Sequence, residues 1–349
     1  MRNPFGIFKQ NVGIDLGTAN TLLYVSGRGI VINEPTAVAV NNKTNKVVAV
    51  GTEAKQMLGR TPMHITVVRP LTTGVINDFE MAQEILRQFL KKLSKDNFFN
   101  YFQNAVIGVP ADLTEVERKS VEDAVLGAGV SKAYVIESAL AAALGARLPV
   151  ADPVANMVID IGGGTTEIAI ISMGGAVTIR SLKIGGDKFN DDIMKFVRDE
   201  FHLAIGEPTA EDIKIQLGSA IPVNDKLELA ISGRDLTTGL PKEVLMKDAH
   251  VRAAIAKSLR HIVDTAKEVI ETAPPELVGD LLRRGVYMCG GGSLLRGIDE
   301  LMSKELATGV TVVDDPLTCA ARGAGIAVEN LEKYDYILNS PMRPRDIRL

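Results

Sequence analysis

Two stretches of the sequence decide its fold: GIDLGTANT at residues 13–21 and VIDIGGGTT at residues 158–166. They align without a gap at an offset of 145 residues, which is the separation of Asp160 from Asp15. Aspartate, glycine and threonine fall at matching positions, and apolar runs typical of β-strands flank both turns. This self-similarity indicates two halves with a common ancestor.

Both stretches have the residues that a phosphate-binding turn requires. Glycine lets the backbone turn tightly and brings amide N–H groups close to an anion, and threonine hydroxyls add donors. Aspartate cannot bind phosphate, but it can hold hydrated Mg²⁺ through water molecules. We therefore expect the two turns to clamp one nucleoside triphosphate, with Mg²⁺ held by Asp15 and Asp160. The expected phosphate-binding residues are Gly17, Thr18, Ala19, Asn20, Gly162, Gly163, Gly164 and Thr165. An ordinary Asp-x-Gly turn is the alternative for either stretch alone.

A third glycine cluster, CGGGS at residues 289–293, lies between a predicted strand and a predicted helix. Glycine at such a place lets a flat ring pack on the backbone, and the amides of the following helix point toward the ligand. We expect Gly290, Gly291, Gly292 and Ser293 to contact the nucleotide. A plain strand-to-helix turn is the alternative.

The periodicity of apolar residues predicts two halves that each begin with strands and continue as alternating strands and helices. Strand patterns fill most of residues 12–75 and 157–183. Helical patterns cover 78–95, 114–127, 138–146, 186–202, 209–217, 247–272, 276–283, 294–306 and 316–330. Each half contains a smaller insertion.

Composition excludes several classes of protein. The 349 residues are 46% hydrophobic and 23% charged, so disorder is not expected, and a net charge of −4 argues against nucleic acid as a partner. Cys289 and Cys319 lack metal-ligand spacing, and we expect both to be reduced cytosolic thiols. No apolar run approaches the roughly 18 residues that span a bilayer.

The three glycine segments, in this order, resemble those of the actin-like ATPases, and more closely those of the bacterial actins of the MreB/Mbl family. The likeness covers nearly the whole chain. Further stretches that carry it are NEP at 33–35, AKQMLGRTP at 54–62, RP at 69–70, IGGD at 184–187 and DPLTC at 315–319.

This resemblance implies a duplicated α/β, actin-like (ribonuclease H-like) fold with the nucleotide in a central cleft. Each of two lobes would contain a large α/β subdomain and a small insertion subdomain. The implied division is IA at 1–35, 76–149 and 326–349, IB at 36–75, IIA at 150–187 and 250–325, and IIB at 188–249.

The resemblance also implies a nucleotide contact from Glu211 and Lys214. They lie three positions apart, on one face of the predicted helix 209–217, so both could reach one ligand. A surface ion pair between them is the alternative.

The segment that carries catalysis in the family departs from the family pattern. The usual stretch is two glutamates, proline, an apolar residue and three alanines, with the second glutamate catalytic. Here residues 136–143 read IESALAAA, so Ser138 replaces that glutamate. Glu137 stays a catalytic candidate, but adjacent residues at a helix start point about 100° apart, so we do not expect it to replace the missing glutamate. Thr166 is a further catalytic candidate.

We therefore expect normal ATP binding and slow hydrolysis, since general-base catalysis contributes roughly 10²–10⁴-fold. The alternative role of Ser138 is to cap helix 138–146.

Two clusters of apolar and aromatic residues beside lysine or arginine predict contact with a membrane surface. The residues are Phe5, Ile7 and Phe8 near the N-terminus, and Phe98, Phe99, Tyr101 and Phe102 in a predicted loop. The alternative is that these rings fill a core.

The remaining expectations come from the resemblance alone. It implies a weak ATPase that binds ATP/ADP and Mg²⁺ and stacks head to tail into paired filaments. The filaments would lie in the cytoplasm against the inner face of the cell membrane, organising wall synthesis and cell shape with membrane proteins of the MreC/RodZ type.

Three rival functions stay open. A specialised paralogue serving motility or copolymerisation would fit the substitution at Ser138. A small-molecule kinase would need a catalytic aspartate and a substrate pocket, and we locate neither. A chaperone ATPase would need a peptide-binding domain after residue 330, where few residues follow.

Overall fold

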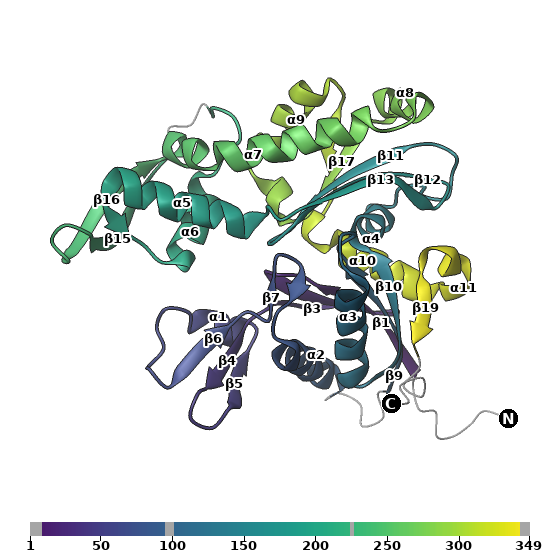
Figure 1. The fold of residues 1–349 in the computed structure, drawn as a ribbon, viewed down its shortest axis with the longest axis horizontal. Coiled ribbons are helices and arrows are strands. Elements are labelled where there is room, and N and C mark those ends of the chain that lie inside the picture. The colour runs from purple at the N-terminus through teal and green to yellow at the C-terminus, as the bar shows by residue number, and fades with distance from the viewer. Residues whose placement is uncertain (1–8, 95–100, 224–226, 343–349) are drawn as a thin grey trace. The chain divides into compact units, whose positions relative to one another are not determined.

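The computed structural model describes residues 9–94, 101–223 and 227–342, which form two compact units (Figure 1). The first unit comprises residues 1–153, 171–177 and 317–349, and the second comprises 154–170 and 178–316. Each is described by itself.

A mixed sheet forms the centre of the first unit, with strand order β19-β10-β9-β1-β2-β3. The first three strands in sequence pair antiparallel, and β1, β9 and β10 run parallel. The strands are β1 (Lys9–Leu16), β2 (Asn20–Val25), β3 (Gly29–Pro35), β9 (Tyr101–Val109), β10 (Val130–Glu137) and β19 (Asn339–Met342).

Helices pack on this sheet through side chains that alternate along its strands. Val12 and Ile14 of β1 are fully buried in the core that also includes residues of α2 (Phe79–Ser94) and α3 (Glu115–Gly127). Gly13 points the other way, where a Cβ would lie 2.4 Å from the backbone N of Gly325 in α10 (Cys319–Glu329). The absence of side chains at Gly13 and Gly325 lets α10 lie directly on the strand.

Helix α10 also crosses α4 (Ser138–Gly145) at very short range. A Cβ on Gly323 would lie 1.7 Å from the Ala141 carbonyl oxygen, and one on Gly145 would lie 1.9 Å from that of Cys319. This packing places α10 in the first unit. The second unit accordingly ends at Pro316, before the boundary expected at 325. The finer division into four subdomains stays a prediction.

The insertion in the first unit is a small sheet with order β5-β4-β6. Its elements, with the β-hairpin that follows, are β4 (Val38–Asn41), β5 (Lys46–Val50), α1 (Thr52–Gln56), β6 (Ile65–Val68), β7 (Leu71–Thr72) and β8 (Val75–Ile76). Glu34 of β3 anchors α1, since its Oε2 accepts hydrogen bonds from the backbone N (2.8 Å) and Oγ1 (2.6 Å) of Thr52. Burial alone would raise the pKa of Glu34, but these bonds and the charge of Lys92 outweigh it and lower the pKa.

The second unit repeats the architecture of the first. Its sheet order is β13-β12-β11-β17-β18, the order in which β3, β2, β1, β9 and β10 occur. The strands are β11 (Asn156–Ile161), β12 (Thr166–Ser172), β13 (Gly175–Leu182), β17 (Val286–Cys289) and β18 (Val310–Val312). Strands β1 and β11 end at Leu16 and Ile161, which preserves the offset of 145 residues seen in the sequence. The topology therefore supports the predicted duplication.

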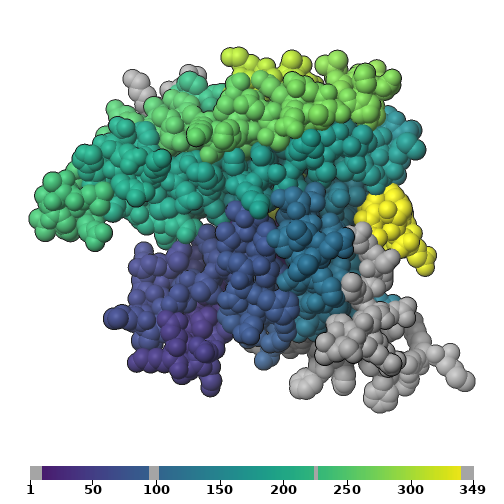
Figure 2. Space-filling model, viewed as in Figure 1, coloured from purple at the N-terminus to yellow at the C-terminus, as the bar shows by residue number. Residues whose placement is uncertain are grey.

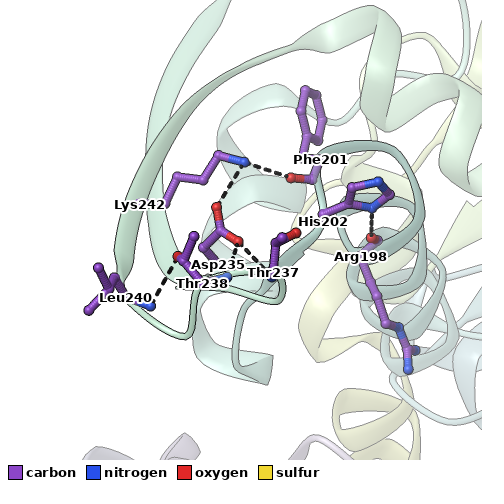
Figure 3. A network of polar contacts seen from close by, with 8 residues as sticks. All are labelled: Arg198, Phe201, His202, Asp235, Thr237, Thr238, Leu240 and Lys242. Carbon is purple, nitrogen blue, oxygen red and sulfur yellow. Dashed lines mark hydrogen bonds and ion pairs between the residues drawn. The ribbon is translucent and has the colours of Figure 1, made fainter.

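The helices of the second unit are α5 (Gly186–Phe201), α6 (Glu207–Leu217), α7 (Asp248–Glu271), α8 (Pro275–Arg284) and α9 (Ile298–Leu306). Its insertion contains a sheet of β14 (Leu203–Ala204), β15 (Glu228–Asp235) and β16 (Pro241–Lys247). Asp235 closes the β15–β16 turn by accepting the Thr237 amide at 2.7 Å and pairing with Lys242, which also donates to the Phe201 carbonyl (Figure 3).

None of the helices within the described ranges combines the length and apolar character needed to cross a bilayer.

Candidate functional site

The two glycine turns have the same internal hydrogen bond. In the first, the Gly17 amide donates to the Asn20 carbonyl at 3.0 Å; in the second, the Gly162 amide donates to the Thr165 carbonyl at 2.9 Å. A Cβ on Gly17 would lie 2.7 Å from the Asn20 oxygen that closes the turn. The duplication thus extends from strand order to single backbone contacts.

Both turns leave the same two amides available. The backbone N–H groups of Thr18 and Ala19 in the first turn, and of Gly163 and Gly164 in the second, meet no acceptor in the described part of the chain. Successive amides that share a turn and lack an internal partner form an anion-binding concavity. Each turn can therefore bind phosphate oxygens.

Hydroxyl groups hold the first turn rigid. Thr36 Oγ1 donates to the Gly17 carbonyl at 2.7 Å and accepts from Thr21 Oγ1 at 2.9 Å. Thr18 Oγ1 accepts the Gly74 amide at 3.1 Å, which leaves its own proton for another acceptor. Thr36 and Gly74 were not among the residues expected here. Their only sequence signal is their position just after the family stretches at 33–35 and 69–70.

The start of α5 supports the second turn. The amides of Gly186 and Asp187 donate to the carbonyls of Gly162 and Gly163 at 3.0 and 2.8 Å. Only glycine fits at position 185, where a Cβ would lie 2.5 Å from the Gly163 oxygen. Thr166 is fully buried, and its Oγ1 donates to the Ile184 carbonyl at 2.7 Å. This geometry favours a structural role for Thr166 over the catalytic one.

Glu211 and Lys214 form the ion pair that was the alternative expectation, with Lys214 Nζ 2.8 Å from Glu211 Oε2. Lys214 Nζ also donates to the Gly186 carbonyl at 3.0 Å, and Asn190 Nδ2 donates to Glu211 Oε2 at 2.6 Å. The pair joins α6 to the part of α5 that supports the second turn. Their contact with nucleotide stays a prediction.

The third glycine cluster packs on the strand end that carries Asp160. A Cβ on Gly290 would lie 2.4 Å from Asp160 Oδ1, and Gly290 has a φ of +78°. Gly291–Leu294 form a 3₁₀ turn, and α9 begins only at Ile298, so the expected helix start at 294 is wrong. Ser293 is 2% exposed and donates to the Gly290 carbonyl, which makes it a structural residue of this turn.

Asp15 lies near the carboxyl end of β1, opposite Leu22 of β2 and Gly108 of β9. No hydrogen-bond or ion-pair partner reaches its carboxylate from the described residues. Burial raises its pKa from 3.8 to about 6. A nearby divalent cation would offset this desolvation, so Asp15 suits the expected metal.

No group of three or more His, Cys, Asp or Glu side chains able to hold a metal occurs within the described ranges. An aspartate acting through water suits Mg²⁺, which keeps several water ligands and prefers phosphate oxygens.

Ser138 lies beside Gly108, the residue of β9 that pairs with Asp15 of β1. Gly108 pairs with Asp15 on one side and with Ile136 on the other, and a Cβ on Gly108 would lie 3.4 Å from Ser138 Oγ. The N-cap of α4 is Glu137, and no side chain caps the helix, so the capping alternative for Ser138 is wrong. The Ser138 hydroxyl has no partner among the described residues.

Comparisons with known proteins agree with these features. The sequence profile described as MreB/Mbl protein matches residues 9–336. The chain belongs to the MreB/Mbl family. It is 44% identical to the cell shape-determining protein Mbl of Bacillus subtilis (strain 168), over 94% of this chain and 98% of the relative. It is 43% identical to the cell shape-determining protein MreB of Escherichia coli (strain K12), over 94% and 96%.

Solved structures of the family confirm the actin-like fold. MreB5 of Spiroplasma citri bound to ADP superimposes with a TM-score of 0.89 and 38% identity, over 95% of this chain and 99% of that one. The AMPPNP-bound form matches with the same score, over 94% and 98%. A MamK double helical filament, 22% identical, matches with a TM-score of 0.78 over 92% and 99% and adds support for the fold alone.

One of the aromatic residues expected to contact a membrane lies instead in the core of the first unit of this MreB/Mbl chain. Phe102 is 4% exposed and belongs to the core beneath α2 and α3, so its assignment to the membrane is wrong. Strand β9 begins at Tyr101, which extends the sheet into the predicted loop. Phe5, Ile7, Phe8, Phe98 and Phe99 lie outside the described residues.

Proposed function

We propose that this MreB/Mbl protein binds ATP with Mg²⁺, hydrolyses it slowly and assembles into filaments that contribute to cell shape. The observation that carries the proposal is the matched pair of turns, each with two amides free to bind phosphate.

Two kinds of relative support nucleotide binding. MreB5 of Spiroplasma citri has been solved with ADP and with AMPPNP, an ATP analogue, at 38% identity to this chain. The Mbl and MreB relatives are named cell shape-determining proteins. We infer ATP and ADP as ligands and cell shape as the process served.

In the proposed site, turn amides bind phosphate oxygens, and Asp15 and Asp160 hold Mg²⁺ through water. The metal neutralises phosphate charge when bound. Ser138 Oγ, with no partner among the described residues, can orient a water molecule but is no effective base at neutral pH. Glu137 leads into α4 as its N-cap, one residue before the position that the family uses. Slow turnover follows.

The proposal has three further parts. The protein assembles into filaments. These attach to the inner face of the cell membrane through the terminal apolar residues and residues 98–99, and they associate with MreC/RodZ-type proteins. A specialised paralogue for motility or copolymerisation is the second candidate. The observation in its favour is Ser138, because a filament that retains ATP would turn over slowly.

Electron microscopy of the purified protein with ATP, ADP or no nucleotide, together with measured phosphate release, tests the proposal. We expect filaments with ATP and release slower than that of a relative with the usual glutamate. Single particles under every condition would contradict assembly. Failure to bind labelled ATP would contradict the site itself.

A further inference from the structure

Thr36 fixes two peptide groups of the first turn at once. Its backbone N donates to the Ala19 carbonyl at 2.9 Å, and its Oγ1 donates to the Gly17 carbonyl at 2.7 Å. A trans peptide group is planar, so its carbonyl and the N–H of the following residue point in opposite directions. Because the Gly17 carbonyl points toward Thr36, the Thr18 amide points away from it. This amide is one of the two in the turn that meet no acceptor within the described ranges.

The same arrangement recurs in the second turn, where the start of α5 replaces the threonine. The Gly162 carbonyl accepts the Gly186 amide at 3.0 Å. The Gly163 carbonyl accepts the Asp187 amide at 2.8 Å. By the same peptide geometry, the amides of Gly163 and Gly164 point away from α5. In the second turn backbone groups therefore orient the free amides, whereas in the first turn one side chain contributes to this orientation.

Thr21 fixes the direction of the Thr36 hydroxyl. The two side chains are 0% and 1% exposed, and their Oγ1 atoms lie 2.9 Å apart. Because the Thr36 proton goes to the Gly17 carbonyl, Thr21 donates the proton in the bond between the two hydroxyls. Buried hydroxyls keep such partners, since a polar group left unpaired away from water is costly. The Thr36 proton is therefore engaged within the protein and is not available to a phosphate.

The first insertion holds the backbone of Thr36 in place. This residue lies in the connection between β3 and β4, through which the chain passes from the central sheet to the insertion (Figure 1). On one side of it, Glu34 accepts two hydrogen bonds from Thr52 at the start of α1. On the other side, the Ala37 carbonyl accepts the Gly51 amide at 2.9 Å. A residue that orients a binding group needs this kind of rigid support.

We propose that Thr36 is a positioning residue for phosphate binding by the first turn. It acts through the Gly17 and Ala19 carbonyls, which it holds so that the Thr18 amide points away from it. The inference rests on the proposed nucleotide function and names the group that orients one of the phosphate donors. Donors that are already ordered bind an anion more tightly than donors that must first be ordered. Loss of the Thr36 hydroxyl should therefore weaken binding of the phosphate chain and leave binding of the nucleoside unchanged.

Thr36→Val tests this role, because valine has a similar shape and keeps the backbone N–H but has no hydroxyl. Titration calorimetry with AMPPNP and Mg²⁺ should give a Kd about tenfold higher than that of the wild type, as expected for the loss of one hydrogen bond. Adenosine, which has no phosphate, should bind with the wild-type Kd. Thr36→Ser keeps the hydroxyl and should retain the wild-type affinity for AMPPNP.

Thr21→Val is a second variant, which removes only the hydroxyl that fixes the direction of the Thr36 hydroxyl. It keeps the bond between Thr36 and the Gly17 carbonyl, so we expect a smaller rise in the Kd for AMPPNP and none for adenosine. Thermal unfolding shows whether each variant folds. If Thr36→Val does not fold, Thr21→Val takes its place in the comparison.

Thr308→Val is the matched control. The Thr308 Oγ1 also donates to a backbone carbonyl, that of Leu281, at 3.0 Å, but neither residue belongs to a glycine turn. We expect this variant to have a lower Tm and the wild-type affinity for AMPPNP. Failure of the wild type to bind AMPPNP contradicts the proposed function. Wild-type affinity in the folded Thr36→Val or Thr21→Val variant, or an equal loss of affinity for AMPPNP and adenosine, overturns the positioning role.

Discussion

The residue that most affects the expected chemistry is Ser138. Its hydroxyl neither caps α4 nor meets another partner in the described part of the chain, and it lies beside Gly108, which has no side chain. If position 138 has the catalytic role that the family resemblance implies, this chain has a serine there in place of the carboxylate.

Restoring that carboxylate should restore turnover. We expect Ser138→Glu to increase the rate of phosphate release by roughly 10²-fold, the lower range for a positioned general base. Ser138→Ala is the control and should change the rate little, because serine is not an effective base. Single-turnover phosphate release measures both, and an unchanged rate in Ser138→Glu would refute the assignment.

Asp15 should make the ligand-free protein less stable as pH rises. Its folded-state pKa of about 6 exceeds the ordinary value of 3.8, so the native state binds the proton more tightly than the unfolded state does. Below about pH 4 the Asp15 carboxyl does not lower the free energy of unfolding. As pH rises through 6, it lowers that free energy by up to about 3 kcal/mol.

We expect Asp15→Asn to remove this loss. Without nucleotide at pH 7, the variant should have a free energy of unfolding higher by up to about 3 kcal/mol. The difference should vanish at pH 4. The Asp15→Asn variant should also bind Mg²⁺–ATP more weakly than the wild type. Urea unfolding at both pH values measures the first effect, and a variant less stable than wild type at pH 7 would contradict the argument.

At the scale of elements, periodicity predicted the long helices because their apolar faces repeat over several turns. Helix α2 at Phe79–Ser94 and α3 at Glu115–Gly127 closely match the expected 78–95 and 114–127. The short α1 was missed because its five residues make fewer than two helical turns, too few for an apolar repeat to be recognised. Sequence also could not show that Gly291–Leu294 would form a separate 3₁₀ turn, since Gly297 with a φ of +69° sets the start of α9.

Local sequence patterns predicted the candidate nucleotide site only in part, as they did the helices. Spacing alone predicted the two turns, because glycine and aspartate are required at fixed positions. The hydroxyl of Thr166 points to Ile184, and Phe102 points into the core, through tertiary contacts that no local pattern encodes.

The contact between α5 and the second turn predicts a sharp difference between two glycines at helix N-caps. Gly185→Ala would place a Cβ 2.5 and 2.7 Å from the carbonyl oxygens of Gly163 and Gly162. We expect this overlap to move the turn, destabilise the protein by about 1–3 kcal/mol and weaken ATP binding.

Gly206, the N-cap of α6, is the matched control. A Cβ there would meet its nearest atom, Pro208 Cδ, at an ordinary 3.6 Å. Gly206→Ala should therefore retain ATP affinity, as titration calorimetry can measure. Equal affinity in both variants would show that α5 does not set the turn.

At the scale of the whole molecule, each unit repeats the other in strand order, turn hydrogen bonds and free amides. The internal sequence repeat was sufficient to predict this duplication. Membrane contact and partners depend on surfaces whose occupants are not encoded by periodicity, so they stay proposals.

The duplication makes a final prediction about the protein in solution. If both turns bind phosphate, Mg²⁺ and AMPPNP should slow amide hydrogen exchange at Thr18 and Ala19 and also at Gly163 and Gly164, because bound oxygens would accept these free N–H groups. The β15–β16 turn is the internal control, since the Thr237 and Thr238 amides already donate to Asp235 (Figure 3). Figure 2 shows one face of the molecule, coloured by residue number. Exchange is measured by peptide, so that the two turns are followed separately. Protection confined to one turn would mean that only one of the two ancestral halves still binds the nucleotide.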